Sequence, residues 1–335
     1  MKRVIIDTDG GTDDAMALLL ALRSPELRVE AITTVCGNVA LEQATSNVLR
    51  TLRLLGEGPH PPVAAGAEAP LLRPLRTARH VHGRDGFGNA TLRRGADGEP
   101  LYPPLRRPLL KQRGDELILE IVRANPGEIS LITLGPLTNL ARAAERDDGG
   151  MRRAKEIIIM GGAFETYGNV TLTAEFNMRV DPEAARRVLE LGIPATFVPL
   201  DATNRVVLTP AMLEPHLGVA AGSEAAGGGG GALAAFVREI TGVVMAYEAE
   251  RRGQPGCTMH DPLAVAVACV PEMARAVETR VLVETKGEYT AGQTIADLRP
   301  RRASQAAAAA PQARVCVEVD AARFFAMFEE RVLKG

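Results

Sequence analysis

Eight residues near the amino terminus, Asp7–Asp14, constrain this chain more than any other segment. Their sequence, Asp-Thr-Asp-Gly-Gly-Thr-Asp-Asp, holds four carboxylates and two glycines. An apolar run, Val4–Ile6, leads in and a helix-like run, Ala15–Leu22, leads out, so the carboxylates lie on a strand-to-helix turn. Four close carboxylates repel one another unless a positive group joins them. Because Ca²⁺ and Mg²⁺ prefer oxygen ligands, the segment predicts a site for a hard divalent cation.

Helix capping explains only part of this cluster. An aspartate at a helix start accepts hydrogen bonds from free N–H groups and suits the positive end of the helix dipole, which could explain Asp13 or Asp14. It does not also explain Asp7 and Asp9, which lie at the end of the strand. The cluster therefore indicates a functional site rather than a structural cap alone.

Two other motifs with aspartate clusters do not fit the spacing. An EF-hand loop requires Gly at its sixth position, where this chain has Thr12, and Glu at its twelfth, where it has Leu18. A haloacid-dehalogenase-like phosphatase would show Asp-x-Asp-Gly-Thr, whereas here Gly11 follows Gly10 and the threonine comes one place late.

The totals limit the class of partner. The net charge of -2 gives no basic surplus for nucleic acid, so we expect none as a partner. No apolar run reaches the roughly 18 residues of a membrane span, and the amino terminus does not read as a signal peptide. The four cysteines are scattered, which favours reduced thiols in a cytoplasmic protein. They are Cys36, Cys257, Cys269 and Cys316.

Strand-like and helix-like runs alternate through most of the chain. This alternation predicts an α/β fold: a mainly parallel, Rossmann-like sheet flanked by helices. Residues 275–319 are β-rich and predict a small carboxyl-terminal addition, and we expect a single domain over 1–335. The expected strands before it are Leu27–Val35, Val63–Ala65, Ile129–Leu134, Glu156–Met160 and Ala195–Leu200, with helices over 40–55, 115–124 and 232–252. Ligands of such sheets bind beyond the carboxyl ends of the strands, where Asp7–Asp14 and Gly37-Asn38 both fall.

Two segments do not follow the alternation. Residues 73–106 are rich in Arg, Gly and Pro, and they form either a mobile flap that brings His82 into the site or a solvated surface loop. His80 and His82 alternate as on a strand. Residues 218–235 are Gly/Ala-rich and predict a flexible surface loop.

Polar residues later in the chain add to the site. Glu175 and Asn177 are two apart, so they share one side of an extended segment and suit the hydroxyls of a sugar. Asp181-Pro182 reads as a helix N-cap followed by a first-turn proline. His260-Asp261-Pro262 could be a second such start, which would explain Asp261 but not His260.

Four separated motifs in order resemble those of the inosine-uridine-preferring nucleoside hydrolases over nearly the full length. They are Asp-x-Asp-x-Gly-x-Asp-Asp-Ala from Asp7, Gly-Pro-Leu-Thr-Asn from Gly135, Glu-Phe-Asn from Glu175 and His-Asp-Pro from His260. The resemblance implies a Ca²⁺-dependent hydrolysis of the N-glycosidic bond of ribonucleosides to ribose and free base, in nucleoside salvage and catabolism. It also implies a homodimer or homotetramer, and a small-molecule ribonucleoside as partner.

The resemblance also implies a role for each site residue. Calcium would be held by Asp9, Asp14, Asp261 and the carbonyl of Leu134, with Asp7 supporting the cluster. Asp9 would take a proton from the attacking water, and His260 would protonate the leaving base, a task that suits histidine near neutral pH. The substrate would be bound by Asp13, Asn38, Glu175 and Asn177, with Met160 and His82 in the same pocket. The base would lie near the helix that carries Val244, Tyr247 and Glu248, which leaves purine and pyrimidine substrates both open.

Two other functions remain open. A Mg²⁺-dependent haloacid-dehalogenase-like phosphatase would also use an acidic cluster, but it should supply a Lys or Arg near the phosphate. A noncatalytic nucleoside-binding protein would keep the ribose-binding residues, yet it has no need of His260.

Overall fold

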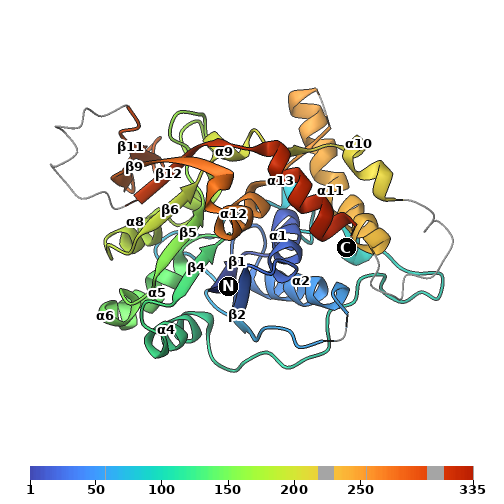
Figure 1. Cartoon of the computed structure of the whole chain (residues 1–335), viewed down its shortest axis with the longest axis horizontal. Coiled ribbons are helices and arrows are strands. Elements are labelled where there is room, and N and C mark those ends of the chain that lie inside the picture. The colour runs from blue at the N-terminus through green and yellow to red at the C-terminus, as the bar shows by residue number, and fades with distance from the viewer. Residues whose placement is uncertain (57, 218–229, 254, 300–312, 335) are drawn as a thin grey trace.

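An eight-stranded sheet runs through the middle of the protein (Figure 1). The computed structural model describes residues 1–56, 58–217, 230–253, 255–299 and 313–334. Seven strands are parallel and only β9 is antiparallel, which confirms the mainly parallel sheet that the alternation predicts. In spatial order the strands are β3 (Val63–Ala65), β2 (Leu27–Thr34), β1 (Lys2–Thr8), β4 (Ile129–Thr133), β5 (Glu156–Met160), β6 (Ala195–Val198), β12 (Ala313–Val319) and β9 (Ala274–Thr279).

The strand order places a topological switch point in the middle of the sheet. The first six strands run 3-2-1-4-5-6, the order of the Rossmann fold, so the chain moves outward from β1 on one side and from β4 on the other. Connections leave opposite faces there and open a crevice at the carboxyl ends of β1 and β4. Asp7 lies at the end of β1, Asp9 directly follows β1, and Leu134 directly follows β4, so both segments lie at this crevice.

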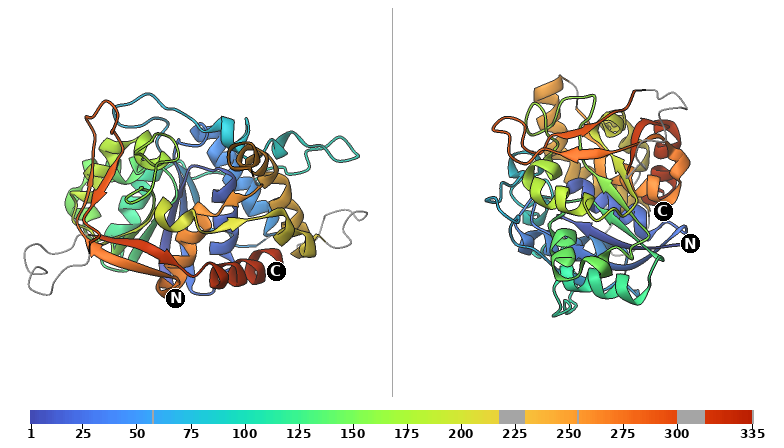
Figure 2. Two further views of the ribbon diagram at one scale, coloured as in Figure 1. Left: turned by 90° about the horizontal axis from the view of Figure 1, so that it is seen from above. Right: turned by 90° about the vertical axis from the view of Figure 1, so that its left-hand side faces the viewer.

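Helices cover both faces of the sheet, as the two views of Figure 2 also show. Successive strand residues point to opposite faces: Ile6 and Ile158 pack in one buried apolar cluster, and Ile5 and Ile157 in the other. The first cluster lies under α1 (Thr12–Leu22), α2 (Leu41–Leu54), α11 (Gly230–Arg252), α12 (His260–Cys269) and α13 (Ala321–Phe328). The second lies under α4 (Gly114–Ala124), α5 (Thr138–Arg146), α6 (Asp148–Met151) and α8 (Pro182–Leu189).

Short elements connect these layers. The short helices are α3 (Arg79–His82), α7 (Phe176–Val180), α9 (Leu200–Thr203) and α10 (Pro210–Leu213), the 3₁₀ turns are Ala90–Leu92, Glu214–His216 and Pro271–Met273, and a π-helical turn spans Glu329–Leu333. Two small antiparallel pairs complete the fold: β7 (Val207–Leu208) with β8 (Cys257–Thr258), and β10 (Val281–Val283) with β11 (Thr294–Ala296).

The carboxyl-terminal β-rich region is confirmed, but half of it belongs to the main sheet. β12 lies between β6 and β9 and is parallel to the first and antiparallel to the second. Only β10 and β11 form a separate hairpin. The predicted Gly/Ala loop falls mostly on 218–229, outside the described residues, and Gly230 already begins α11.

Within residues 73–106, the part around Asp85 is anchored to the body of the protein, whereas most of residues 92–99 are exposed as in the predicted surface loop. The Asp85 carboxylate accepts hydrogen bonds from the backbone N–H groups of Phe87, Asn89 and Thr91 at 2.8–2.9 Å. Phe87 is buried and packs edge-to-face on Phe236 of α11. The strand-like alternation of the two histidines was wrong: both lie on α3, whose first turn closes because Ala78 O accepts from the N–H groups of residues 81 and 82.

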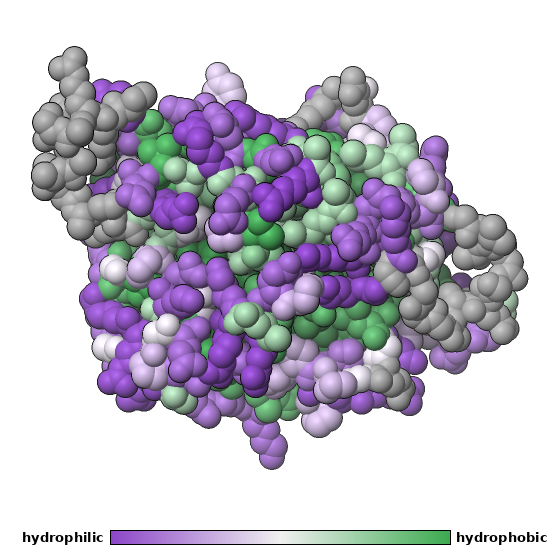
Figure 3. Space-filling view, in the orientation of Figure 1, coloured by the Kyte–Doolittle hydropathy of each residue, from purple (hydrophilic) through white to green (hydrophobic). Residues whose placement is uncertain are grey.

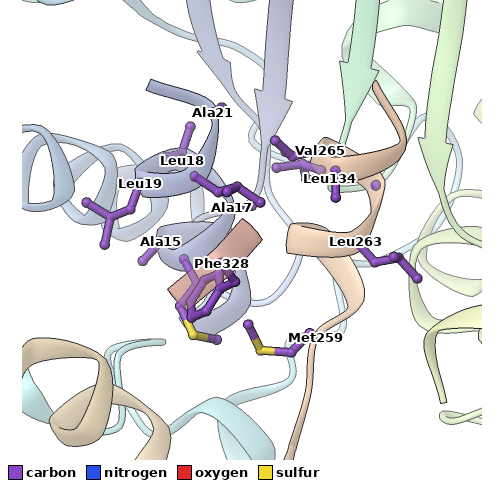
Figure 4. Packing of buried hydrophobic residues seen from close by; sticks show 14 of the residues in the cluster. Ala15, Ala17, Leu18, Leu19, Ala21, Leu134, Met259, Leu263, Val265 and Phe328 are labelled. Carbon is purple, nitrogen blue, oxygen red and sulfur yellow. The ribbon is translucent and has the colours of Figure 1, made fainter. Parts of the chain in front are cut away.

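The packing of α1 against α12 brings together residues that are almost 250 positions apart (Figure 4). Ala17 of α1 and Val265 of α12 both belong to the apolar cluster between the two helices. Both helices begin at the crevice end of the sheet, so their first turns carry Asp14 and Asp261 toward each other.

The surface in Figure 3 mixes hydrophilic residues with smaller hydrophobic areas. Among the described residues, no helix combines the length and the apolar character needed to cross a membrane.

Candidate active site

A cavity of about 720 Å³ opens at the carboxyl ends of β1, β4 and β5. It is lined by nine of the twelve site residues predicted from the sequence: Asp13, Asn38, His82, Leu134, Met160, Glu175, Asn177, His260 and Asp261. The other three, Asp7, Asp9 and Asp14, are almost fully buried and do not line it. The structure thus brings residues from seven segments of the chain to one place.

Three buried aspartates form the centre of the site. One carboxylate oxygen from each of Asp13, Asp14 and Asp261 lies within 4.8 Å of the other two. Asp14 is held by its own turn: Gly11 N donates to its Oδ2 at 2.8 Å and Asp9 N to its Oδ1 at 3.2 Å, and the Thr8 hydroxyl also donates to it. Asp14 therefore helps to cap the start of α1, as predicted, and its carboxylate still belongs to the acidic cluster.

Asp9 adjoins this centre and is fixed by Asn38. Asn38 N donates to Asp9 Oδ2 at 2.6 Å, and the Asn38 side-chain amide donates to Oδ1 at 2.9 Å. Gly37, which follows β2, lies against Asp9. A side chain does not fit at this position, because a Cβ on Gly37 would lie 2.0 Å from Asp9 Oδ2. The turn itself uses Gly10 at φ +70°, a left-handed conformation that favours glycine.

Burial and mutual repulsion raise the pKa values of three of these carboxylates. Burial, and then the charge of Asp14, raises the pKa of Asp13 to about 8. Burial also raises the pKa of Asp261 well above its usual range, as do the charges of Asp13 and Asp14. Burial and Asp14 act the same way on the pKa of Asp9. Across the described part of the chain, no Lys or Arg forms an ion pair with any of them.

The donor set fits a hard divalent cation. All the converging atoms are carboxylate oxygens, which Ca²⁺ and Mg²⁺ prefer. Asp13 Oδ1 is buried and has no hydrogen-bond partner among the described residues, although a buried acceptor ordinarily has one. A cation between these groups would supply the missing positive charge, and the unpartnered Asp13 Oδ1 leaves an acceptor for a bound ligand.

The polar wall opposite the aspartates comes from α7. The Asn177 side-chain amide donates to the carbonyl oxygens of Leu134 at 2.9 Å and Met160 at 3.1 Å, which ties α7 to the ends of β4 and β5. The predicted extended segment is wrong here, because Glu175 is a helix cap: it accepts from Asn177 N, Met178 N and Gly162 N. The segment turns into a helix at Phe176 because this carboxylate satisfies its first N–H groups. Burial raises the pKa of Glu175 to about 7.

The two Asp-Pro pairs play different parts. Asp181 is the N-cap of α8, where its side chain accepts from Ala184 N at 3.0 Å, as predicted. Asp261 is not an N-cap, because α12 already begins at His260 and its side chain joins the acidic cluster instead. His260 is half-buried at the cavity, and its Nδ1 lies 2.8 Å from the hydroxyl oxygen of Thr203.

Two histidines of α3 reach the cavity. His82 Nδ1 accepts a hydrogen bond from Thr12 N at 3.4 Å and lies 3.9 Å from Asp13 Oδ1. Burial lowers the pKa of His82 to about 4, so this ring is neutral at neutral pH and is not the missing cation. His80 lies edge-to-face with Tyr247 of α11, 6.0 Å between ring centres, and both rings line the cavity.

Asp7 is held behind the site. Its Oδ1 accepts from the Thr33 hydroxyl at 2.6 Å and from the Asn139 side-chain amide at 2.7 Å. Asn139 also donates to Thr34 O at 2.9 Å and accepts from Ala67 N at 2.8 Å, so it joins the ends of three strands. Burial raises the pKa of Asp7 to about 7.

Reasoning from the sequence missed the residues that hold the others in place. Thr33 and Thr203 carry no local signal, whereas Asn139 belongs to the Gly-Pro-Leu-Thr-Asn motif and could have been noted there. It also missed one wall of the cavity, residues 166–170, which lie in a loop after β5, and Arg251 at the end of α11.

Comparisons with known proteins agree with this geometry. The sequence profile described as inosine-uridine preferring nucleoside hydrolase matches residues 4–326. The chain is 37% identical to the pyrimidine-specific ribonucleoside hydrolase RihA of Salmonella gallinarum over 332 residues, 98% of this chain and 97% of that protein.

Solved structures agree as well. A plant nucleoside hydrolase, PpNRh1, matches with a TM-score of 0.85 and 32% identity, over 100% of this chain and 99% of that one. A purine-preferring ribonucleoside hydrolase from Gardnerella vaginalis matches with a TM-score of 0.84 and 29% identity, over 99% and 98%. The chain therefore belongs to the inosine-uridine-preferring nucleoside hydrolase family, a family of N-glycosyl hydrolases.

Proposed function

We propose that this chain is a Ca²⁺-dependent hydrolase that cleaves the N-glycosidic bond of ribonucleosides to ribose and free base. The observation that carries the proposal is the buried group of Asp13, Asp14 and Asp261, of which Asp13 and Asp261 line a cavity together with Asn177 and His260. Acidic, amide and imidazole groups at one cavity are the set that such a cleavage needs: a site for the cation, donors for the sugar and an acid for the base.

We assign the cation to Asp9, Asp14, Asp261 and the carbonyl oxygen of Leu134. Bound there, Ca²⁺ would hold a water molecule and lower its pKa. The Leu134 carbonyl already accepts from Asn177, but a carbonyl oxygen has a second lone pair for a metal. Asp7 would support the cluster from behind, through Thr33 and Asn139.

Asp9 is the proposed base. A carboxylate oxygen of Asp9 would take the proton of the attacking water as its oxygen adds to C1′ of the ribose. Asn38 donates to both carboxylate oxygens of Asp9 and so fixes the direction of the group before the substrate arrives. Water attacks one face of the sugar while the base leaves from the other.

The ribose hydroxyls would be bound by Asp13, Asn38, Glu175 and Asn177. Asp13 Oδ1 lacks a hydrogen-bond partner among the described residues and lines the cavity, so it can accept from a sugar hydroxyl. The departing base leaves positive charge on the ribose, and the surrounding carboxylates stabilise that charge. Met160 and His82 complete the walls of this part of the cavity.

His260 is the proposed acid. As the bond from C1′ to the base nitrogen breaks, its electron pair goes to the base, and an imidazolium N–H would protonate it. The products are ribose and neutral base. The new C1′–O bond uses the oxygen of the water, and the new N–H bond of the base is balanced by the water proton that Asp9 takes. A noncatalytic nucleoside-binding protein would not need this group at the cavity.

Both purine and pyrimidine nucleosides are candidate substrates. The similar proteins differ in this respect, since the Salmonella protein is named pyrimidine-specific and the Gardnerella protein purine-preferring. The end of the cavity near α11 presents the ring of Tyr247 and the guanidinium of Arg251, whose carbon lies 5.3 Å from the ring centre. Stacking on such a surface accepts either kind of base.

The test is a base-release assay with inosine, uridine, cytidine and adenosine in the presence of CaCl₂, with reducing sugar as the readout. We expect sugar release from at least one nucleoside, loss of release on chelation, and almost no turnover by Asp9→Ala. Phosphate release from a nucleotide, without sugar release from any nucleoside, would favour the phosphatase. Saturable binding without cleavage would favour the binding protein.

We also propose that the protein works in the cytoplasm as a homodimer or homotetramer. The location is supported by its four cysteines, all free thiols. The assembly rests on the family resemblance. Light scattering on the purified protein measures the mass of the assembly directly, and a monomer at micromolar concentration would contradict it.

A further inference from the structure

We propose that Thr203 is a positioning residue for His260: its hydroxyl oxygen accepts the Nδ1 proton and so presents Nε2 to the leaving base. The inference rests on the proposed function, because it gives His260 the task of an acid. Its basis is the 2.8 Å contact between Thr203 Oγ1 and His260 Nδ1, which joins residues 57 positions apart.

The backbone fixes both partners. Thr203 is fully buried in α9, a single turn that follows β6, and its N–H donates to Pro199 O at 3.0 Å. The next links are backbone hydrogen bonds from Val206 N to Thr203 O at 2.9 Å and from Met259 N to Val206 O at 2.9 Å. The start of α12 is therefore tied through one residue to the end of α9, which holds the two backbones at a fixed separation.

The chemistry of imidazole gives this contact a catalytic consequence. A histidine that donates a proton must carry protons on both nitrogens beforehand and on one afterwards. A hydroxyl oxygen can accept from Nδ1–H in both states, so only the Nε2 proton is transferred. Without that acceptor, the ring loses the contact that favours the Nδ1-protonated tautomer and this setting of χ2, and Nε2–H points at the base for a smaller part of the time. A small misplacement of a catalytic group can cost roughly 10²-fold in rate.

A matched set of variants separates the hydrogen bond from the packing. Thr203→Val keeps the shape of the side chain and removes the hydroxyl, whereas Thr203→Ser keeps the hydroxyl and removes the methyl group. Thr51→Val is the control: Thr51 is equally buried, on α2, and its hydroxyl donates to Asn47 O at 3.0 Å in its own helix. It removes one buried hydroxyl without touching the ring.

The experiment compares two leaving groups. One substrate is the nucleoside that the wild-type protein cleaves best among the four above, and the other is 4-nitrophenyl β-D-ribofuranoside, whose nitrophenolate leaves without being protonated. We expect Thr203→Val to lower kcat on the nucleoside about 10- to 100-fold with little change in KM, and kcat on the nitrophenyl riboside less than about 3-fold. Thr203→Ser should restore the nucleoside rate to within about 3-fold, and Thr51→Val should leave the ratio of the two rates unchanged.

Equal losses on both substrates would overturn the proposal, because they would mean a purely structural role for Thr203. An unchanged nucleoside rate in Thr203→Val would also overturn it. If the wild-type protein cleaves the nitrophenyl riboside but no nucleoside, the proposed function fails, and a measurement without turnover decides the role of Thr203.

That measurement is the ¹⁵N spectrum of the histidine rings in protein labelled with [¹⁵N]histidine at a pH above 8. The chain has five histidines, and a His260→Ala sample identifies the resonances of the fifth. A single Nδ1-protonated tautomer in the wild type that becomes a mixture in Thr203→Val supports the positioning role. Identical His260 resonances in the two proteins contradict it.

Discussion

Buried carboxylates occur in two regions of this protein, and they are balanced in opposite ways. In the outer helical layer of α4, α5 and α8, Asp115 is paired with two guanidinium groups, Arg113 Nε at 3.0 Å and Arg146 Nε at 2.6 Å. In the same layer Asp181 accepts from the Thr138 hydroxyl, Leu71 N and Ala184 N. At the carboxyl edge of the sheet, Asp13, Asp14 and Asp261 face one another instead.

The difference shows how a structural carboxylate can be told from a functional one. Asp115 and Asp261 are both almost fully buried, so burial alone does not separate them. Their partners separate them. In the outer layer, arginines and hydrogen-bond donors of the chain balance the carboxylates, whereas the negative charge of the site is left to be balanced by a bound cation. Replacing a carboxylate should therefore have opposite effects in the two regions.

The largest expected effect is at Asp261. Asp261→Asn should lower turnover by about 10³-fold or more, because the cation would lose a charged ligand, and cations of this kind contribute several kcal/mol to transition-state stabilisation. The same variant without metal should unfold at a higher temperature than the metal-free wild type at pH 8, since one repelling charge is gone. The base-release assay measures turnover, and calorimetric scans with CaCl₂ and with chelator measure Tm, whose rise on adding calcium should be lost in the variant.

Asp115→Asn is the counterpart of that variant. It should keep turnover within about twofold and retain the calcium response, but lower the free energy of unfolding by about 2 kcal/mol, because Arg113 and Arg146 lose their charged partner. If Asp115→Asn abolished the calcium response, or Asp261→Asn kept it, the distinction between the two regions would fail.

The next effect is at Asn139, a neutral side chain that serves the acidic site. Asn139→Ala should lower the free energy of unfolding by about 2–3 kcal/mol, because Asp7, Thr34 O and Ala67 N all lose a buried partner. Urea denaturation measures this loss. The control is Asn125→Ala at the end of α4, where the side chain bonds Arg3 and Ile121 O and is partly exposed, so we expect less than about 1 kcal/mol. Equal losses would mean that the site is held no more tightly than the surface.

Contacts such as that of Asn139 with Asp7 also mark the limit of what the sequence predicts. The strands could be predicted because apolar residues such as Val4–Ile6 form short runs between helical segments, and the carboxyl ends of parallel strands share one edge. Asn139 and Asp7 are 132 positions apart, and Thr203 and His260 are 57 apart. No local pattern encodes such pairs, because they depend on the way α5 and α9 dock onto the sheet.

Two local features could not be predicted, for reasons that the structure makes plain. Glu175 caps α7 as well as lining the cavity, and a residue that serves both purposes has no separate signature for either. The place of β12 between β6 and β9 also has no local sign, since its pairing is set by the partners that remain open at the edge of the sheet.

A smaller effect should appear in the pH dependence of stability. Burial raises the pKa of Glu175 from about 4.5 to about 7, so between these values the folded state binds a proton that the unfolded state has lost. The free energy of unfolding of the metal-free protein should therefore fall as the pH rises from 5 to 7, by at most about 1.4 kcal/mol per pH unit for this group. Glu26 has the opposite effect. Its hydrogen bond with Arg331 lowers its pKa, so its contribution to the free energy of unfolding is lost as the pH falls.

Urea midpoints at several pH values, in the wild type and in Glu175→Gln, isolate this term. The variant should be less stable at every pH, because the amide replaces one acceptor of the α7 cap. That loss does not change the slope of the free energy of unfolding against pH. A shallower fall in Glu175→Gln supports the assignment, and parallel curves would mean that Glu175 is ionised in the folded protein at pH 5.

The smallest effect should be at another large cavity, on the outer helical layer. With about 820 Å³ it exceeds the proposed active site, and it is lined by residues of the outer layer that include Arg146 and Arg186. Its charges are largely paired: Arg186, about half exposed, lies 2.9 Å from Glu190 one helical turn on, and Arg146 binds Asp115. An exposed pair of this kind contributes at most about 0.5 kcal/mol. Arg186→Ala should therefore change the free energy of unfolding by no more than this and turnover by less than about twofold, measured by urea denaturation and the base-release assay. A larger loss of turnover would give this cavity a part in the reaction, and volume rather than unbalanced charge would then have been the better guide to function.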